Sequence, residues 1–194
     1  IPTHPMMHPA MSTALPVLRP DRTGPQAPRA PGHARRPGQL LDSHGRCIRD
    51  VRLSLTDRCN FRCVYCMEPG DRFLPKMELL DFDEYIRLVD ILLVLGIRTI
   101  RLTGGEPTLY PQLDELISAI GRRDFDDVAM TTNGSRLELD QLESWRRSGL
   151  RRLTFSLDTL REDRMTAITR SRTSVADVIH AINLAKVAGY PRPK

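Results

Sequence analysis

Three of the four cysteines lie close together, and their spacing suits metal chemistry. Cys59, Cys63 and Cys66 follow a C-x3-C-x2-C pattern in the segment CNFRCVYC. Three thiolates match three irons of a 4Fe–4S cluster and leave the fourth iron open to a small molecule. Structural zinc normally needs a fourth protein ligand, and neither a second C-x2-C pair nor a nearby histidine supplies one. The spacing therefore favours an iron–sulfur cluster over the two alternatives, zinc and coincidental thiols.

The cysteines and the lengths of the apolar runs indicate the cellular compartment of the protein. Cys47 lies outside the pattern and is expected to be an unliganded thiol. Clustered thiols are typical of a reducing compartment rather than of disulfides. The longest apolar run, residues 91–95, is far shorter than the roughly 18–20 residues that span a bilayer. We therefore expect a soluble, cytoplasmic protein with no membrane partner.

The composition divides the chain near residue 45. Of 194 residues, 29 are Lys or Arg and 24 are Asp or Glu, so the net charge is +5. Residues 1–45 contain 9 of the 15 prolines and account for +3 of that charge. They lack helical or alternating periodicity, which predicts a disordered tail, with an organellar transit peptide as the less favoured alternative. The remaining +2 does not indicate a nucleic-acid partner for residues 46–194.

Residues 46–194 alternate between β-rich and helical runs, which predicts an α/β fold. Strands are expected at Val51–Leu55, Thr99–Leu102, Val128–Met130 and Leu153–Leu157, and helices over residues 81–96, 112–121, 139–149, 161–169 and 175–188. Four strand–loop–helix repeats imply parallel strands with right-handed crossovers. Residues 191–194 would lead into a fifth strand. A complete eight-unit barrel needs about 250 residues, so we expect either a small doubly wound sheet or the first four strands of a (β/α) barrel.

Five motifs, in order and with similar spacing, carry a family resemblance. They are residues 52–58 (RLSLTDR), the cysteine segment, residues 103–107 (TGGEP), 131–134 (TTNG) and 155–158 (FSLD). Together they resemble the radical S-adenosylmethionine superfamily and, within it, the GTP 3′,8-cyclases of molybdenum cofactor biosynthesis. The resemblance covers about residues 40–194 and implies an incomplete radical S-adenosylmethionine barrel of partial TIM type.

The resemblance also implies a reaction. A cluster on Cys59, Cys63 and Cys66 would bind S-adenosylmethionine and reduce it, giving methionine and a 5′-deoxyadenosyl radical. That radical would take a hydrogen atom from C3′ of GTP, and C3′ would then attack C8, giving 3′,8-cyclo-7,8-dihydro-GTP. The enzyme would be a lyase, with no catalytic residue assigned beyond the cluster.

Three residues match positions that bind S-adenosylmethionine in the family: Tyr65, Gly105 and Ser156. Each also has a plainer interpretation. A loop aromatic can cover the cluster from water, two glycines can form a strand-to-helix turn, and a serine at a strand end can simply face solvent.

Four residues match positions that bind GTP: Arg52, Arg101, Thr132 and Lys194. Both arginines begin strands whose alternate residues are apolar, so they project either into the lumen or into solvent. A lumen arginine is costly without an anion, and triphosphate would supply one. The turn before Lys194 is one residue longer than is usual in the family.

The sequence departs from the family in one respect. The cyclases hold a second 4Fe–4S cluster on three cysteines of a C-terminal region, and Cys47 is the only cysteine left here. We therefore expect an N-terminal fragment that is inactive alone. The alternatives are another radical S-adenosylmethionine enzyme, such as a peptide-maturing one, and a non-catalytic iron–sulfur module. The implied partners are GTP, a flavodoxin- or ferredoxin-type electron donor, cyclic pyranopterin monophosphate synthase and, in a homodimer, a second copy.

Overall fold

The computed structural model of the chain describes residues 38–68 and 70–194. Most of the predicted tail, residues 1–37, therefore lies outside the described residues. The described residues begin with a loop in which Leu41 pairs with Cys47 in an antiparallel bridge. The backbone N–H of Leu40 donates to the carbonyl of Leu95 at 3.3 Å. Contacts with the α/β part thus begin before residue 46, the boundary expected from composition.

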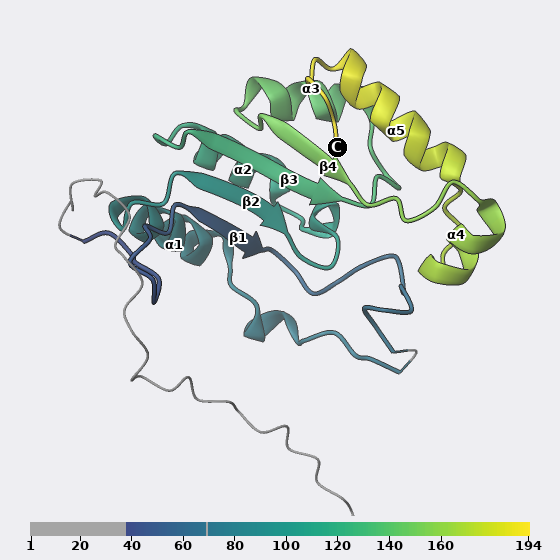
Figure 1. Ribbon diagram of the computed structural model, residues 1–194, viewed down its shortest axis with the longest axis horizontal. Helices are drawn as coiled ribbons and strands as arrows, with labels where there is room; N and C mark the ends of the chain where they lie inside the picture. Colours follow the sequence, from purple (N-terminus) through teal and green to yellow (C-terminus); the bar gives the residue numbers. More distant parts are fainter. Residues whose placement is uncertain (1–37, 69) are drawn as a thin grey trace, which may run out of the picture. The chain divides into compact units, whose positions relative to one another are not determined.

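Four parallel strands form one sheet in the order β1-β2-β3-β4. The strands are β1 (Asp50–Ser54), β2 (Thr99–Thr103), β3 (Asp127–Thr132) and β4 (Arg152–Phe155). The helices are α1 (Phe82–Val94), α2 (Leu113–Gly121), α3 (Leu139–Arg147), α4 (Glu162–Thr169) and α5 (Val175–Val187). Two short 3-10 helices, η1 (Lys76–Glu78) and η2 (Pro107–Leu109), lie in the loops. Figure 1 shows α1, α2 and α3 behind the sheet, which confirms the prediction of a partial barrel.

The two faces of the sheet differ in polarity because side chains alternate along a strand. One face is apolar and buried, and it includes Leu53, Ile100, Leu102, Val128, Met130 and Leu153. The opposite face includes Arg52 and Arg101, which are partners in the β1–β2 register. The apolar face forms the core with the helices, which leaves the polar face as the lumen side of the partial barrel.

Helix α1 begins where the sequence pattern predicts. The N–H of Glu84 donates to Oδ1 of Asp81 at 2.9 Å, and the N–H of Asp81 donates to Oε2 of Glu84 at 2.9 Å. This capping box satisfies two N–H groups that have no partner within the helix. Tyr85 and Val89 then direct the buried face of α1 toward the sheet.

The last described residues run beside β4, where a fifth strand is expected from the sequence. The N–H of Lys194 donates to the carbonyl of Leu153 at 3.2 Å, and the N–H of Phe155 donates to the carbonyl of Lys194 at 2.6 Å. Lys194 therefore occupies part of the edge of β4 and satisfies backbone groups there.

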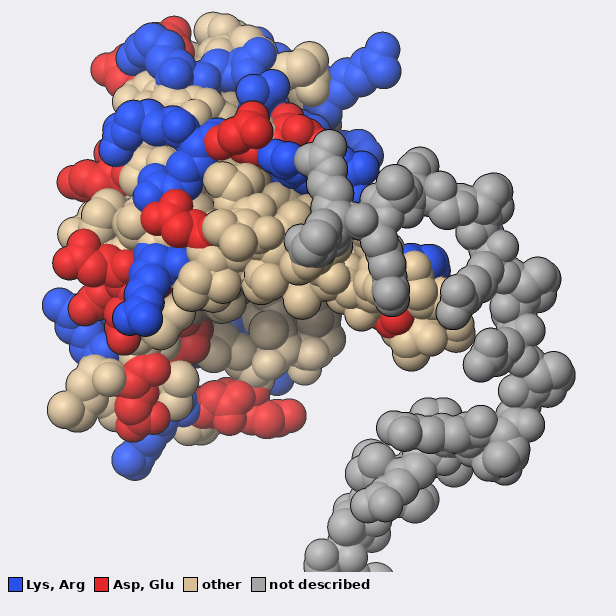
Figure 2. All heavy atoms as spheres, turned by 90° about the vertical axis from the view of Figure 1, so that its left-hand side faces the viewer, with Lys and Arg blue, Asp and Glu red and all other residues tan. Residues whose placement is uncertain are grey.

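The end of the molecule at the amino ends of the strands carries acidic and basic side chains that alternate over its surface (Figure 2). Ion pairs there join Arg49 to Asp126 at 3.5 Å, Arg98 to Asp124 at 3.1 Å and Arg123 to Asp90 at 2.6 Å. A single exposed pair such as Arg49–Asp126 contributes little to stability. None of the helices in the described residues has the length and apolar character needed to cross a lipid bilayer.

Candidate functional site

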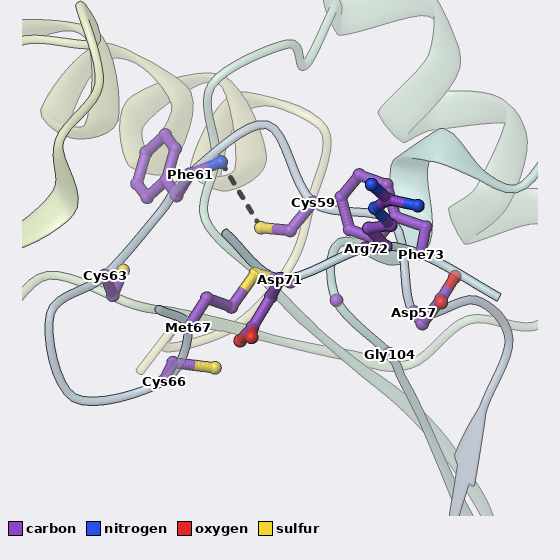
Figure 3. Close-up of a pocket in the computed structure, with 11 residues that line it drawn as sticks. Asp57, Cys59, Phe61, Cys63, Cys66, Met67, Asp71, Arg72, Phe73 and Gly104 are labelled. Carbon is purple, nitrogen blue, oxygen red and sulfur yellow. Dashed lines mark hydrogen bonds between the residues drawn. The ribbon is translucent and has the colours of Figure 1, made fainter. Parts of the chain in front are cut away.

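A cavity of about 360 Å³ lies beyond the carboxyl ends of β1 and β2 and contains the three thiols of the cysteine motif (Figure 3). Its lining residues are Asp57, Cys59, Phe61, Cys63, Cys66, Met67, Asp71, Arg72, Phe73, Gly104 and Gly105. Carboxyl ends of parallel strands are the usual place for a site in this architecture, because loops from several strands meet there.

The three thiols differ in their surroundings. Cys59 and Cys63 are half-buried and Cys66 is exposed. Burial raises the pKa of the Cys59 and Cys63 thiols, although the Phe61 N–H, 3.3 Å from the Cys59 sulfur, opposes this effect at Cys59. A metal binds the thiolate, so it must displace the proton from these two groups.

The three motif thiols line the same cavity. Within the described residues, no three Cys, His, Asp or Glu side chains form a group that could hold a single metal ion. In a 4Fe–4S cluster each thiolate binds a different iron. A set of three thiols therefore suits three irons of such a cluster, with the fourth iron left open to a small molecule.

Helix α4 holds the middle of the cysteine loop in place. The N–H of Arg62 donates to the carbonyl of Thr169 at 2.8 Å, and the N–H of Val64 donates to the carbonyl of Ile168 at 2.9 Å. Carbonyls in the last turn of a helix have no partner within it, so they are free to accept these bonds. Phe61, only 4% exposed, anchors the same loop in the core.

Gly104 and Gly105 let the end of β2 pack directly against the start of the cysteine loop. The N–H of Gly105 donates to the carbonyl of Thr56 at 2.6 Å. A Cβ on Gly105 would lie 2.4 Å from the carbonyl oxygen of Arg58, and one on Gly104, where φ is +151°, would lie 2.5 Å from that of Thr56. From the sequence we expect these glycines to admit a ligand. They line the cavity, and they also make room for the backbone of residues 55–58, which follow β1.

Glu106 is a buried carboxylate that joins this turn to the end of β3. It is 1% exposed. Its Oε1 accepts from the N–H and hydroxyl of Thr108 at 3.2 and 2.8 Å and from the hydroxyl of Thr132 at 2.7 Å. Its Oε2 accepts from the N–H of Asn133 at 2.7 Å. Both oxygens thus receive a backbone N–H, which is how a buried charge becomes tolerable.

We expect Glu106→Gln to lower the free energy of unfolding by about 2 kcal/mol. Glutamine has one carbonyl oxygen, so its NH₂ group must face either the Thr108 or the Asn133 N–H, and donor would meet donor. Chemical denaturation of the apo protein measures the change. Glu138→Gln is the matched control, because Glu138 is exposed and its side chain does not cap α3. Equal stability of the two variants would contradict this role for Glu106.

The structure brings one of the three predicted S-adenosylmethionine residues to the cavity wall. Gly105 lines the cavity, whereas Tyr65 and Ser156 are not among its lining residues. Tyr65 is 67% exposed. Its hydroxyl donates to the Asp158 carboxylate at 2.8 Å, and this bond is the largest cause of the raised pKa of Tyr65. Ser156 is exposed, and its N–H donates to the carbonyl of Thr132 at 2.9 Å.

The predicted GTP residues fall in three places. Arg52 is exposed and Arg101 half-buried on the polar face of the sheet, and the Arg101 guanidinium donates to Oγ1 of Thr154 at 3.1 Å. Thr132 is 1% exposed on the opposite, helix-facing side, where its hydroxyl donates to Glu106. The alternation that buries Val128 and Met130 already indicates that side for Thr132. Lys194 is exposed beside β4.

Arg52 and Arg101 differ from a third arginine on the same face. Arg152 is ion-paired with Asp127. Within the described residues, neither Arg52 nor Arg101 forms an ion pair. The two unpaired guanidinium groups therefore face the lumen side with no carboxylate to neutralise them.

Several site residues are missed by the sequence reasoning although they lie inside the quoted motifs. They are Asn60, Glu106, Asn133 and Asp158, and Ser135 directly follows one motif. Their positions inside or next to the motifs could have marked them as site residues. The motifs do not indicate which of these side chains contact one another, because the partners are far apart in the sequence.

Comparison with known sequences places the chain in a family. Residues 53–193 match the Radical SAM superfamily. The chain is 44% identical over 157 residues to a GTP 3′,8-cyclase of Ectopseudomonas mendocina, covering 80% of this chain and 47% of that protein. It is 42% identical over 158 residues to one of Staphylococcus saprophyticus, covering 78% and 46%. The chain thus spans about half the length of the curated relatives it matches.

Solved structures of low identity share the fold. Streptococcus suis SuiB bound to S-adenosylmethionine matches 73% of this chain and 32% of its own, with a TM-score of 0.62 and 18% identity. Methylornithine synthase matches 76% of this chain and 44% of its own, with a TM-score of 0.58 and 17% identity. With its cysteine motif on a cavity at the strand ends and a family match over most of its length, the chain belongs to the Radical SAM superfamily.

Proposed function

We propose that this chain forms the cofactor-binding part of a GTP 3′,8-cyclase that uses a 4Fe–4S cluster and S-adenosylmethionine. The observation that carries the proposal is a single cavity lined by the three motif thiols and by the backbone of Gly104 and Gly105. When bound, the cluster would supply the electron that cleaves S-adenosylmethionine, and the adenosyl radical would remove a hydrogen atom from C3′ of GTP. The choice of GTP is supported by relatives at 41–45% identity that are named GTP 3′,8-cyclase.

The chain's own residues would divide the binding work by position. Cys59, Cys63 and Cys66 would hold the cluster, and Gly104–Gly105 would present backbone groups to S-adenosylmethionine. Tyr65 and Ser156, on the loops beside the cavity, are the proposed contacts to the rest of that cofactor. Tyr65 is well suited to a fixed position because its hydroxyl is bonded to Asp158.

The lumen side would bind the triphosphate. Arg52 and Arg101 are register partners on neighbouring strands, so both guanidinium groups could reach one anion. A partly buried cation without a counter-ion is unfavourable, and a phosphate group would remove that cost through charge-assisted hydrogen bonds. Lys194 would add a third cation from beside β4. Thr132 would contact GTP only by giving up its bond to Glu106.

The proposed reaction carries further expectations from the family resemblance. It needs a one-electron donor of the flavodoxin or ferredoxin type. Its product would pass to cyclic pyranopterin monophosphate synthase in the cytoplasm. A homodimer is the proposed assembly, and nucleic acid is not a proposed partner.

Cleavage of S-adenosylmethionine tests the cofactor part of this proposal. The anaerobically reconstituted chain, reduced with dithionite, should convert S-adenosylmethionine to methionine and 5′-deoxyadenosine, which chromatography separates. Slow turnover would support the proposal, because any cleavage of S-adenosylmethionine to these two products requires a bound, reducible cluster. A chain with a full complement of iron that leaves S-adenosylmethionine intact would argue for a non-catalytic iron–sulfur module instead.

Binding of GTP tests the substrate part. We expect Arg101→Ala to weaken GTP binding by about 1.5–3 kcal/mol, the usual contribution of a hydrogen bond to a charged group, and Arg52→Ala to act similarly. Isothermal titration with GTP measures the change. Arg87→Ala is the matched control, because Arg87 is exposed on the outer helix α1. Unchanged affinity in both lumen variants would remove the assignment of GTP to this face.

A further inference from the structure

A closed ring of hydrogen bonds joins the cysteine loop to the turn that follows β3. Nδ2 of Asn60 donates to Oγ of Ser135 at 2.7 Å. The N–H of Ser135 donates to Oδ1 of Asn133 at 3.0 Å, and Nδ2 of Asn133 donates to Oδ1 of Asn60 at 2.8 Å. Each residue both donates and accepts, so none of the three can move without breaking two bonds. Asn60 directly follows the first motif cysteine.

The ring is attached to a rigid part of the fold. Asn133 is only 5% exposed, and its backbone N–H donates to the buried Glu106 carboxylate. The next N–H, of Gly134, donates to Oγ1 of Thr132 at 3.1 Å. Glu106 in turn directly follows Gly105, which lines the cavity. The ring therefore connects Cys59 with the glycine wall of the same cavity through partly buried and buried hydrogen bonds.

The ring also lies between two other anchors of the loop. Before it, the carbonyl of Arg58 accepts from the N–H of Glu106 at 2.8 Å. After it, the N–H groups of Arg62 and Val64 bond to the end of α4. Both of these anchors use backbone groups, whereas the ring holds the intervening segment through side chains.

We propose that Asn60, Asn133 and Ser135 are positioning residues, which fix the Cys59 sulfur relative to the Gly104–Gly105 backbone. This inference rests on the cluster assignment in the proposed function. If Cys59 shifts, the open iron shifts relative to the glycine wall that would receive S-adenosylmethionine. A displacement of about 1 Å in a site of this kind is enough to impair reactivity strongly.

The test compares variants of Ser135 and Asn60 with a matched control. Ser135→Ala removes the acceptor for Asn60, whereas Ser135→Thr retains a hydroxyl at a half-exposed position. Asn60→Ala removes two of the ring's three hydrogen bonds at once. Asn183→Ala is the control, because Asn183 is exposed on α5. Thermal unfolding of each apo protein checks that every variant folds.

Two measurements are sensitive to the position of the cluster: the rate of iron release and the electron paramagnetic resonance spectrum. In the presence of a chelator, Ser135→Ala and Asn60→Ala should each release iron about tenfold faster than the unchanged chain, an effect at the upper end for the loss of one net hydrogen bond. The double variant, which combines Ser135→Ala with Asn60→Ala, should release iron no faster than Asn60→Ala alone, because residues of one network do not act additively. Ser135→Thr should stay within about twofold of the unchanged chain. In the two alanine variants, S-adenosylmethionine should also change the electron paramagnetic resonance spectrum of the reduced cluster less.

The outcomes separate this inference from the proposed function. Alanine variants that match Asn183→Ala in iron release and in spectrum, or a double variant whose effect is the product of the two singles, would overturn the positioning role. A Ser135→Thr variant as impaired as Ser135→Ala would overturn it as well. Failure of the unchanged chain to assemble any cluster would overturn the proposed function, and this inference with it.

Discussion

Replacing Cys59, Cys63 or Cys66 with serine should remove most of the bound iron, whereas Cys47→Ser should leave it unchanged. The three motif cysteines line one cavity. Cys47 lies in the loop before β1, where its thiol donates to Oε1 of Gln39 at 3.5 Å. Serine keeps the size of the side chain but is a poor ligand for iron, so the effect isolates the thiolate.

Iron and sulfide analysis after anaerobic reconstitution measures this effect. The unchanged chain and the Cys47→Ser control should each bind about four irons, the content of one 4Fe–4S cluster. Loss of iron in the Cys47 variant would show that the ligand set is different. Zinc in the protein as purified, retained by the same three cysteines, would contradict the cluster assignment.

Gly105→Ala should be among the most destabilising single changes near the site. The added Cβ would lie 2.4 Å from the carbonyl oxygen of Arg58, 2.5 Å from that of Asp57 and 2.6 Å from the carbonyl carbon of Arg58. These are backbone atoms, so they cannot move aside as a flexible side chain would. We expect a loss of about 3 kcal/mol in the free energy of unfolding, at the upper end for overpacking, because β2 and the cysteine loop must separate.

The same separation should impair loading of the cluster, since Cys59 follows Arg58 directly. Chemical denaturation of the apo protein and iron analysis after reconstitution give the two measurements. Gly70→Ala is the matched control, because a Cβ there would have no atom within 4 Å, and its effect should be within about 0.5 kcal/mol. A Gly105→Ala protein as stable as this control and fully loaded with iron would contradict the packing role.

The sequence by itself determined most of the secondary-structure elements. Alternation in Val51–Leu55 predicts a strand, and β1 is found at Asp50–Ser54. The Asp81–Glu84 pair predicts the start of α1, and both capping bonds are present. These two predictions succeed because periodicity and caps act over a few residues and need no knowledge of what packs against them.

Strand ends were less predictable. Leu153–Leu157 is expected as a strand, yet β4 ends at Phe155. The N–H of Ser156 still bonds to the carbonyl of Thr132, but the chain then turns so that Asp158 accepts from Tyr65. That bond joins residues 93 positions apart, and no local pattern encodes it.

The tertiary structure decided which motif side chains act together. Thr132 donates to Glu106 on the buried side, and the Gly104–Gly105 turn accommodates the backbone of the segment that follows β1. Asn60 closes a ring with Asn133 and Ser135. The ring partners are 73 and 75 positions apart, and they meet because the β1–β2–β3 register brings three carboxyl strand ends to one edge. The side of the sheet and the partner of each polar group are properties of that register, so they follow only once the strands are paired.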